Sequence, residues 1–252
     1  MTRPGPDFLL IGAMKAGTTS LFDYICQHPR ILPPEQKELH YYDRTIYDGD
    51  TLDDYLRRFP SKAEDQLSGE ATPYYLRHPH CPAWIKRDFP DVRLMAILRN
   101  PTDRAYSHYN QRFTKGKEHR DFQQIIAEED DAVRAEWQAV CDDPELAPRV
   151  SKQNSYLSRS RYAEQLEAWF ECFPREQMLV LFSEELSAQP EQEMKRVFDH
   201  LGIDSVSVDT AQRRNVRKYD PMPAETRALL DSYFAQDRAR LADMLGITLP
   251  WN

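Results

Sequence analysis

The sequence predicts an α/β fold of three layers, with a central parallel sheet flanked by helices. Near-continuous apolar runs at 8–12, 92–99 and 178–182 are typical of strands that are covered on both faces. Segments with the apolar spacing of helices lie between these runs, and strands that alternate with helices form parallel sheets. The 252 residues contain no internal repeat or linker, so we expect one domain over residues 1–252.

The first strand ends at Gly12 and leads into the loop AMKAG. Thr18 after this loop is a typical N-cap residue, and Leu21, Phe22 and Ile25 then recur with helical spacing. The elements expected further along are a strand at 67–73, a helix at 79–89, a strand at 92–99, a helix with Pro101 in its first turn, a helix at 155–173, a strand at 178–182 and helices at 192–201 and 224–245.

One segment of the chain differs from the rest in its charge. Residues 118–145 hold ten Asp or Glu but only two arginines, Arg120 and Arg134. Charge runs of this kind are usually a solvated helical face. We therefore expect an acidic helical insertion at about 116–152.

Composition narrows the class of protein. The formal net charge is −8, whereas nucleic-acid-binding domains are normally basic, so we expect no nucleic-acid partner. The first residues have no signal-peptide core, and the sequence has no apolar run long enough to span a membrane. The four cysteines are too scattered for a disulfide framework or a metal site, which fits a reducing compartment. These features predict a cytoplasmic protein without a membrane partner.

The loop after the first strand predicts an anion-binding site. Residues 12–19 read Gly-Ala-Met-Lys-Ala-Gly-Thr-Thr, and they connect a strand to a helix. Such a turn directs backbone N–H groups and the positive end of the helix toward an anion. The pattern resembles a P-loop, so the predicted fold is P-loop-like. It departs from a Walker A loop because Thr18 takes the position of the lysine, and Lys15 lies in the middle of the loop.

This departure has a chemical meaning. Transfer of the γ-phosphate of ATP normally requires Mg²⁺, and no predicted strand ends in an obvious metal-binding aspartate. A sulfuryl group carries less negative charge during transfer, so a lysine and backbone donors can stabilise it without a metal. A P-loop nucleotide kinase and a non-catalytic nucleotide-binding protein are the two alternatives.

Several further stretches resemble heparan sulfate-type and related bacterial sulfotransferases, which use 3′-phosphoadenosine 5′-phosphosulfate (PAPS) as the donor. Their order and spacing along the chain carry the resemblance. They are KELHYYD at 37–43, ILRNPTDRAYSHY at 97–109, YAEQLEAW at 162–169, MLVLF at 178–182 and the segment 186–202.

The resemblance implies a role in donor binding for each matching residue. Arg99 and Ser107 would hold the 3′-phosphate, for which the planar fork of arginine is well suited, and Tyr162 would lie near the adenine. The residues that would hold the 5′-phosphosulfate are Lys15, Ala16, Gly17, Thr18, Thr19 and Ser20. Arg213, Arg214 and Asn215 fall where the family has a basic loop over the 3′-phosphate, although the glycine of that loop is missing here.

The resemblance also implies a catalytic set. Glu38 would take the proton of the acceptor, and Lys15 would stabilise the leaving oxygen. His40 is a second candidate base, and in an extended segment it would face the same side as Glu38. Glu70 would orient a substrate or a loop lysine. The acceptor is expected to be a small molecule or a glycan, in a pocket shaped by loops at 44–66 and 110–155.

Overall fold

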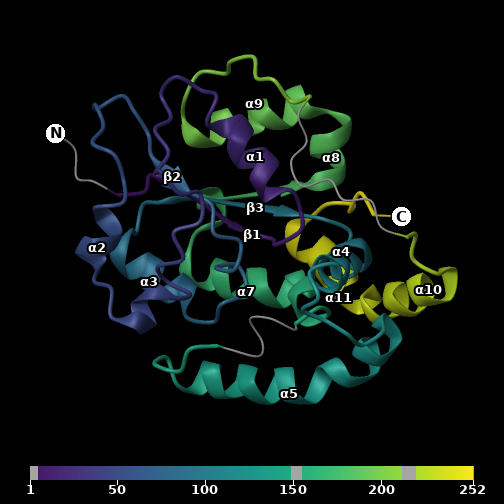
Figure 1. The fold of residues 1–252 in the computed structure, drawn as a ribbon. Helices are drawn as coiled ribbons and strands as arrows, with labels where there is room; N and C mark the ends of the chain where they lie inside the picture. Colours follow the sequence, from purple (N-terminus) through teal and green to yellow (C-terminus); the bar gives the residue numbers. More distant parts are fainter. Residues whose placement is uncertain (1–4, 149–154, 212–219, 252) are drawn as a thin grey trace. The chain divides into compact units, whose positions relative to one another are not determined.

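A computed structural model describes residues 5–148, 155–211 and 220–251 (Figure 1). The chain forms two compact units, and each is described by itself. The first comprises Met1–Leu98 and Trp169–Val216, and the second comprises Arg99–Ala168 and Arg217–Asn252. A single domain over the whole chain stays a prediction.

The first unit contains a four-stranded parallel sheet in the order β2-β1-β3-β4. Its strands are β1 (Phe8–Gly12), β2 (Gly69–Glu70), β3 (Arg93–Leu98) and β4 (Met178–Phe182). Every residue of β1 is buried, as its uninterrupted apolar run predicts. β2 is shorter than the predicted strand at 67–73 because the N–H of Ala71 leaves the sheet and donates to the carbonyl of Lys37.

Helices cover the sheet of the first unit. Figure 1 places α1 and α9 on one face and α3 on the other, which confirms the predicted three layers. The helical segments of this unit are α1 (Thr18–Ile25), η1 (Thr45–Asp48), α2 (Leu52–Leu56), α3 (Cys81–Asp88), η3 (Arg175–Gln177), α8 (Ser183–Ala188), α9 (Pro190–Leu201) and the last turn of α7 (Tyr162–Cys172). The helix α9 begins two residues before the predicted position because Pro190 occupies its first turn.

The strand order places a ligand site at one edge of the sheet. β1 and β3 are neighbours, and the chain continues from β1 to β2 on one side and from β3 to β4 on the other. Parallel sheets bind ligands outside the carboxyl ends of their strands, at the point where the order reverses. The predicted phosphate loop follows Gly12 at the end of β1, and Arg99 follows Leu98 at the end of β3.

The second unit is helical in its described part. It contains α4 (Pro101–Phe113), α5 (Phe122–Asp142), η2 (Ser158–Ser160), the first turns of α7, α10 (Ala224–Tyr233) and α11 (Ala235–Leu245). Asn100 caps α4 through hydrogen bonds from the N–H groups of Thr102 and Asp103. Two predictions were wrong in detail: the helix at 155–173 begins only at Tyr162, and the helix at 224–245 is divided at Phe234.

The acidic segment forms the predicted helix, α5, whose N-terminus has a capping box between Asp121 and Gln124. It is not purely a solvated face. Phe122 and Ile125 are buried in a cluster with Tyr109 of α4 and Leu230 of α10. The start of α5 therefore belongs to the core of the second unit. Across the described residues, no helix is both long and apolar enough to cross a membrane.

Candidate active site

The phosphate loop is fixed by backbone contacts to neighbouring elements. The N–H of Ala13 donates to the carbonyl of Ile97 in β3 at 2.7 Å, and the hydroxyl of Ser183 donates to the carbonyl of Ala16. Gly17 is the N-cap of α1, with φ at 101°, a conformation that glycine adopts without strain. It has no side chain with which to cap the first turn of α1, so this helix end suits an anion.

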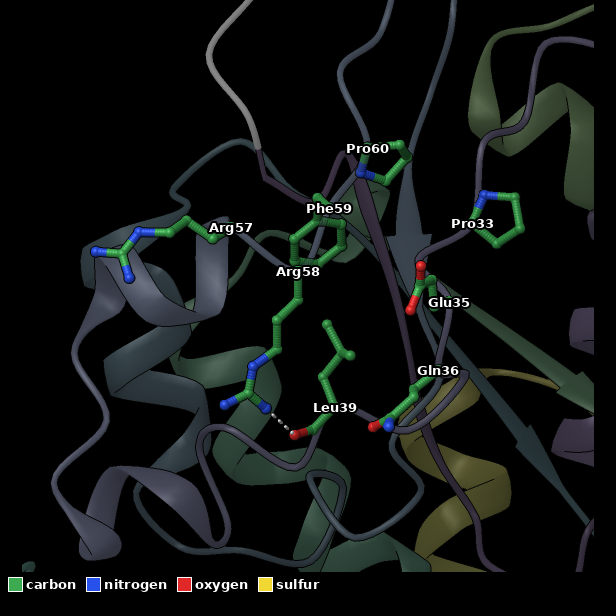
Figure 2. Close-up of a pocket in the computed structure, with 8 residues that line it drawn as sticks. All are labelled: Pro33, Glu35, Gln36, Leu39, Arg57, Arg58, Phe59 and Pro60. Atoms are coloured by element: carbon green, nitrogen blue, oxygen red, sulfur yellow. Dashed lines mark hydrogen bonds between the residues drawn. The ribbon is translucent and has the colours of Figure 1, made fainter.

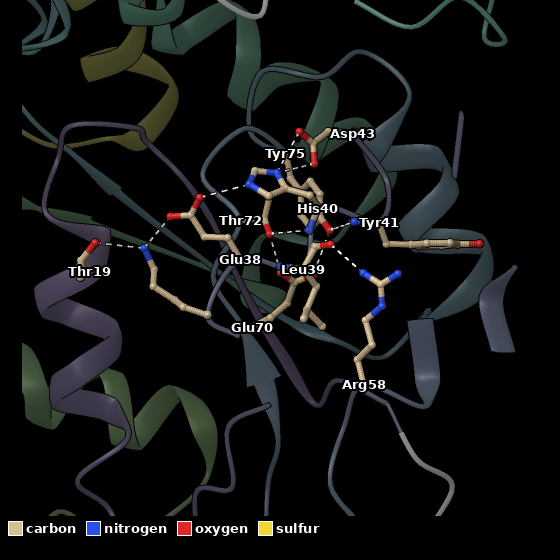
Figure 3. A network of polar contacts seen from close by, with 11 residues as sticks. Thr19, Glu38, Leu39, His40, Tyr41, Asp43, Arg58, Glu70, Thr72 and Tyr75 are labelled. Carbon is tan, nitrogen blue, oxygen red and sulfur yellow. Dashed lines mark hydrogen bonds and ion pairs between the residues drawn. The ribbon is translucent and has the colours of Figure 1, made fainter. Parts of the chain in front are cut away.

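Glu38, His40 and Asp43 form one chain of polar contacts (Figure 3). Nε2 of His40 lies 3.2 Å from Oε2 of Glu38, and Nδ1 lies 3.0 Å from Oδ1 of Asp43. Asp43 is buried, whereas Glu38 and His40 are partly exposed. The structure thus brings the two predicted candidate bases together and adds a carboxylate behind the histidine.

The surroundings of Glu38 and His40 shift the pKa values of these two groups in opposite directions. Burial lowers the pKa of His40, but the hydrogen bonds and charges of Asp43 and Glu38 raise it to about 9. Burial raises the pKa of Glu38, but the hydrogen bonds and charges of His40 and Lys37 leave it below its usual value. At neutral pH the histidine is therefore a cation that donates from both nitrogens, and the glutamate is an anion able to accept a proton.

Two candidate catalytic residues have an unusual backbone conformation. Among the described residues other than glycine, positive φ values occur at Lys15 (73°) and His40 (53°). Such conformations are costly for most side chains and persist where the surrounding structure holds them. For His40 the holding contacts include Asp43 on the ring and the hydroxyl of Thr72, which accepts from the backbone N–H at 3.3 Å.

Lys37 is a further residue of this site, and its motif alone predicts no role for it. Its Nζ donates to Oγ1 of Thr19 at 3.1 Å and to Oε1 of Glu38 at 2.9 Å. It therefore links the first turn of α1 to the candidate base. The signal in the sequence was its place beside Glu38 in the motif KELHYYD.

Glu70 contacts the backbone of the segment 38–40 and two tyrosines. The predicted partners were a substrate or a loop lysine, so the observed contacts differ from the predicted ones. Its carboxylate is fully buried and accepts from the N–H of Leu39 at 3.0 Å and from the hydroxyls of Tyr55 and Tyr75 at 2.9 Å. Burial raises the pKa of Glu70, while these hydrogen bonds and one from Thr72 act against that rise. Glu70 positions the backbone that carries Glu38 and His40.

A pocket of about 570 Å³ lies beside the same segment (Figure 2). Nη1 of Arg58 donates to the carbonyl of Leu39 at 3.1 Å, and in Figure 3 this arginine reaches Leu39 from the side opposite Thr19. The residues that line the pocket are Pro33, Glu35, Gln36, Leu39, Arg57, Arg58, Phe59 and Pro60. Part of this lining comes from the loop at 44–66, where the sequence predicts an acceptor pocket.

Three predicted donor-binding residues lie in the second unit. Arg99 is partly exposed, and its carbonyl accepts from the hydroxyl of Tyr162 at 3.0 Å. Tyr162 is fully buried and thus holds the backbone of Arg99, while Ser107 is buried on α4. The predicted residues Arg213, Arg214 and Asn215 lie outside the described residues.

Comparisons with known proteins point to one family. The family model described as "Sulfotransferase domain" matches residues 5–223. A crystal structure of a sulfotransferase from Alicyclobacillus acidocaldarius is 28% identical, covers 97% of both chains and has a TM-score of 0.79.

Two named relatives have similar levels of sequence identity. A membrane-associated sulfotransferase of Dictyostelium discoideum is 25% identical over 98% of this chain and 66% of its own length. Heparan sulfate glucosamine 3-O-sulfotransferase 3A1 of Mus musculus is 29% identical over 81% of this chain and 47% of its own length. The chain thus spans about half to two thirds of these relatives. Because the family model covers most of the chain, this protein belongs to the sulfotransferase domain family.

Proposed function

We propose that this protein transfers a sulfuryl group from PAPS to a hydroxyl or amine of a small-molecule or glycan acceptor. One observation carries the proposal: an ionised Glu38 is held, through Lys37, against Thr19 in the first turn of the helix that follows the phosphate loop. A carboxylate next to an anion-binding turn is suited to deprotonate an acceptor beside a bound donor.

The donor-binding roles follow the family motif. The 5′-phosphosulfate is held by Lys15, Gly17, Thr18 and Thr19. The backbone of Ala16 and Ser20, in the same segment, also takes part. Arg99 and Ser107 hold the 3′-phosphate, and Tyr162 supports the backbone of Arg99 through its 3.0 Å hydrogen bond. The proposal also assigns Arg213, Arg214 and Asn215 to that phosphate, from their place in the family motif.

The proposed reaction is an in-line displacement. PAPS supplies the activated sulfuryl group. The acceptor oxygen or nitrogen forms a bond to sulfur while the bond from sulfur to the bridging phosphate oxygen breaks, and the electron pair of that bond stays on the phosphate. Glu38 takes the acceptor proton, and Lys15 stabilises the charge on the leaving oxygen. These roles require no metal ion.

The acceptor and the compartment are further parts of the proposal. A net charge of −8 disfavours encounter with a heavily sulfated polymer, so we propose a small or weakly charged acceptor. The mouse relative, by its name, acts on heparan sulfate, and this chain differs from it in that respect under the proposal. None of the four cysteines, which all lie among the described residues, forms a disulfide bond; this supports a reducing compartment, and we place the protein in the cytoplasm.

Replacement of Glu38 tests the proposal. Transfer of labelled sulfate from PAPS into a pool of metabolites and glycans is compared between wild type, Glu38→Gln and His40→Ala. We expect Glu38→Gln to bind the 3′,5′-bisphosphate product normally but to lose transfer by about 10²–10⁴-fold, the usual contribution of a general base. His40→Ala loses less. If Glu38→Gln transferred sulfate normally and His40→Ala had no activity, His40 would be the base.

A further inference from the structure

The ammonium of Lys37 lies between the two groups that the proposed reaction must connect. On one side it contacts Thr19 at 3.1 Å, in the first turn after the phosphate loop, and on the other it contacts Glu38 at 2.9 Å. Its side chain is only 19% exposed. The charge is therefore held at a defined place and is not that of a mobile surface lysine.

The reaction places sulfur in this same interval. Under the proposed function, the loop at the start of α1 holds the phosphate oxygen that leaves sulfur. Glu38 takes the proton of the acceptor atom that attacks sulfur from the opposite side. A cation in contact with both the first turn of α1 and Glu38 is then well placed to face the sulfuryl group itself.

We propose that Lys37 is a catalytic residue that binds the sulfuryl group of the donor and stabilises it during transfer. An ammonium has three N–H donors, and Thr19 and Glu38 accept two of them. The third donor is directed to a sulfuryl oxygen. This inference rests on the proposed function and adds a second lysine to Lys15, with a different target: Lys15 acts on the leaving oxygen and Lys37 on the group that moves.

The pairing with Glu38 gives this lysine a defined part in the reaction. Before transfer, the ammonium of Lys37 is attracted both to the carboxylate of Glu38 and to the sulfuryl oxygens. When Glu38 accepts the acceptor proton, its carboxylate becomes neutral. The sulfuryl oxygens are then the remaining anionic partner of Lys37, so its attraction for them is strongest as the new bond forms. Such a change favours the transition state over the bound donor.

A purely structural role for Lys37 makes a different prediction. If Lys37 only oriented Glu38, its replacement would slow transfer but would leave the affinity for the donor unchanged. If Lys37 binds the sulfuryl group, its replacement lowers the affinity for the donor PAPS. The affinity for the product stays the same, because the 3′,5′-bisphosphate lacks that group. The ratio of the two affinities separates these roles and requires no knowledge of the acceptor.

The experiment is calorimetric titration of PAPS and of the 3′,5′-bisphosphate into wild type, Lys37→Met, Lys37→Arg, Glu38→Gln and Lys195→Met. Lys195 is a matched control, because it also pairs with a carboxylate, that of Asp199, but lies on the exposed face of α9. For Lys37→Met we expect a loss of PAPS affinity of roughly ten-fold or more, the usual size of one lost charge-assisted hydrogen bond. The affinity for the bisphosphate should change less than about two-fold.

The other variants complete the test. Lys37→Arg should recover part of the PAPS affinity, and Lys195→Met should keep the wild-type ratio. Glu38→Gln removes the carboxylate charge that shares the ammonium of Lys37, so it should keep or raise the preference for PAPS over the bisphosphate. If Lys37→Met lost affinity equally for PAPS and for the bisphosphate, or for neither, Lys37 would not bind the sulfuryl group. Wild-type protein that binds neither ligand would instead contradict the proposed function, so the two failures are distinguishable.

Discussion

At the scale of single residues, the proposed roles of Glu38 as the base and His40 as a supporting residue depend on their charges. The sequence placed both residues in one motif but left the choice of base open. Only the fold supplies Asp43 behind the ring of His40 and Lys37 beside Glu38. These neighbours raise the pKa of the histidine and lower that of the glutamate, so tertiary contacts support the proposal that Glu38 is the base.

The charge of His40 makes the stability of the protein depend on pH in a defined direction. Its folded-state pKa, about 9, lies above the ordinary value of 6.5. The contribution of His40 to stability is therefore fully present below pH 6.5 and is lost as the pH rises through 9. We expect the free energy of unfolding of wild type to exceed that of His40→Asn by on the order of 2 kcal/mol at pH 6.

This difference should shrink steadily between pH 7 and pH 10. Urea denaturation of both proteins at several pH values measures it directly. A difference that stays constant over this range would show that His40 is not held as a cation in the folded protein.

At the scale of elements, the phosphate loop depends on the left-handed backbone of Gly17. A Cβ at this position would meet no atom closer than 3.8 Å, so alanine would be strained by φ and not by a clash. The cost of that conformation is about 1–2 kcal/mol. We expect Gly17→Ala to lower the free energy of unfolding by that amount and also to weaken binding of the bisphosphate product.

Gly49 provides a matched control, because its φ is 94° and a Cβ there would meet nothing within 4 Å. Gly49→Ala should lose similar stability and keep its affinity for the bisphosphate. Denaturation measures the free energy of unfolding of the two variants, and calorimetry measures their affinity for the bisphosphate. If Gly17→Ala bound the bisphosphate as well as Gly49→Ala does, the loop conformation would have no part in anion binding.

Sequence patterns predicted the elements well where the local signal was complete. The strands at 8–12 and 178–182 were correct at both ends, because buried parallel strands have continuous apolar runs. The helix predicted at 224–245 was wrong in its middle, since it divides at Phe234, whose side chain is fully buried. That break is set by packing, which apolar spacing alone does not encode.

The site shows the same contrast between local and tertiary information. The motifs identified Lys15, Glu38 and His40 as candidate catalytic residues. They did not reveal that Glu70, a residue of β2, accepts hydrogen bonds from Leu39 and two tyrosines. That role depends on where separate segments meet in the folded chain, and a motif does not describe it.

At the scale of the whole molecule, the proposed donor requires recognition of two phosphate groups. We expect the 3′,5′-bisphosphate to raise the melting temperature far more than AMP does, because a ligand that binds only the native state stabilises it in proportion to its affinity. Arg99→Ala should remove most of this preference, at a cost of roughly 1.5–3 kcal/mol in binding of the bisphosphate. Binding of AMP should change little.

Arg161→Ala is the control for that variant, because Arg161, the residue before α7, pairs with Glu164 of that helix at 3.4 Å. It should leave the preference intact. Equal stabilisation of wild type by AMP and by the bisphosphate would contradict a dedicated site for the 3′-phosphate.

We propose that the whole molecule moves a sulfuryl group from PAPS without a metal ion. The most direct test incubates the wild-type protein and a pool of acceptors with PAPS labelled in its sulfate, in EDTA, and beside it with labelled ATP and Mg²⁺. We expect labelled acceptor and an equal amount of released bisphosphate from PAPS in EDTA, and no transfer from ATP. Loss of all turnover in EDTA, with transfer from ATP restored by Mg²⁺, would contradict it.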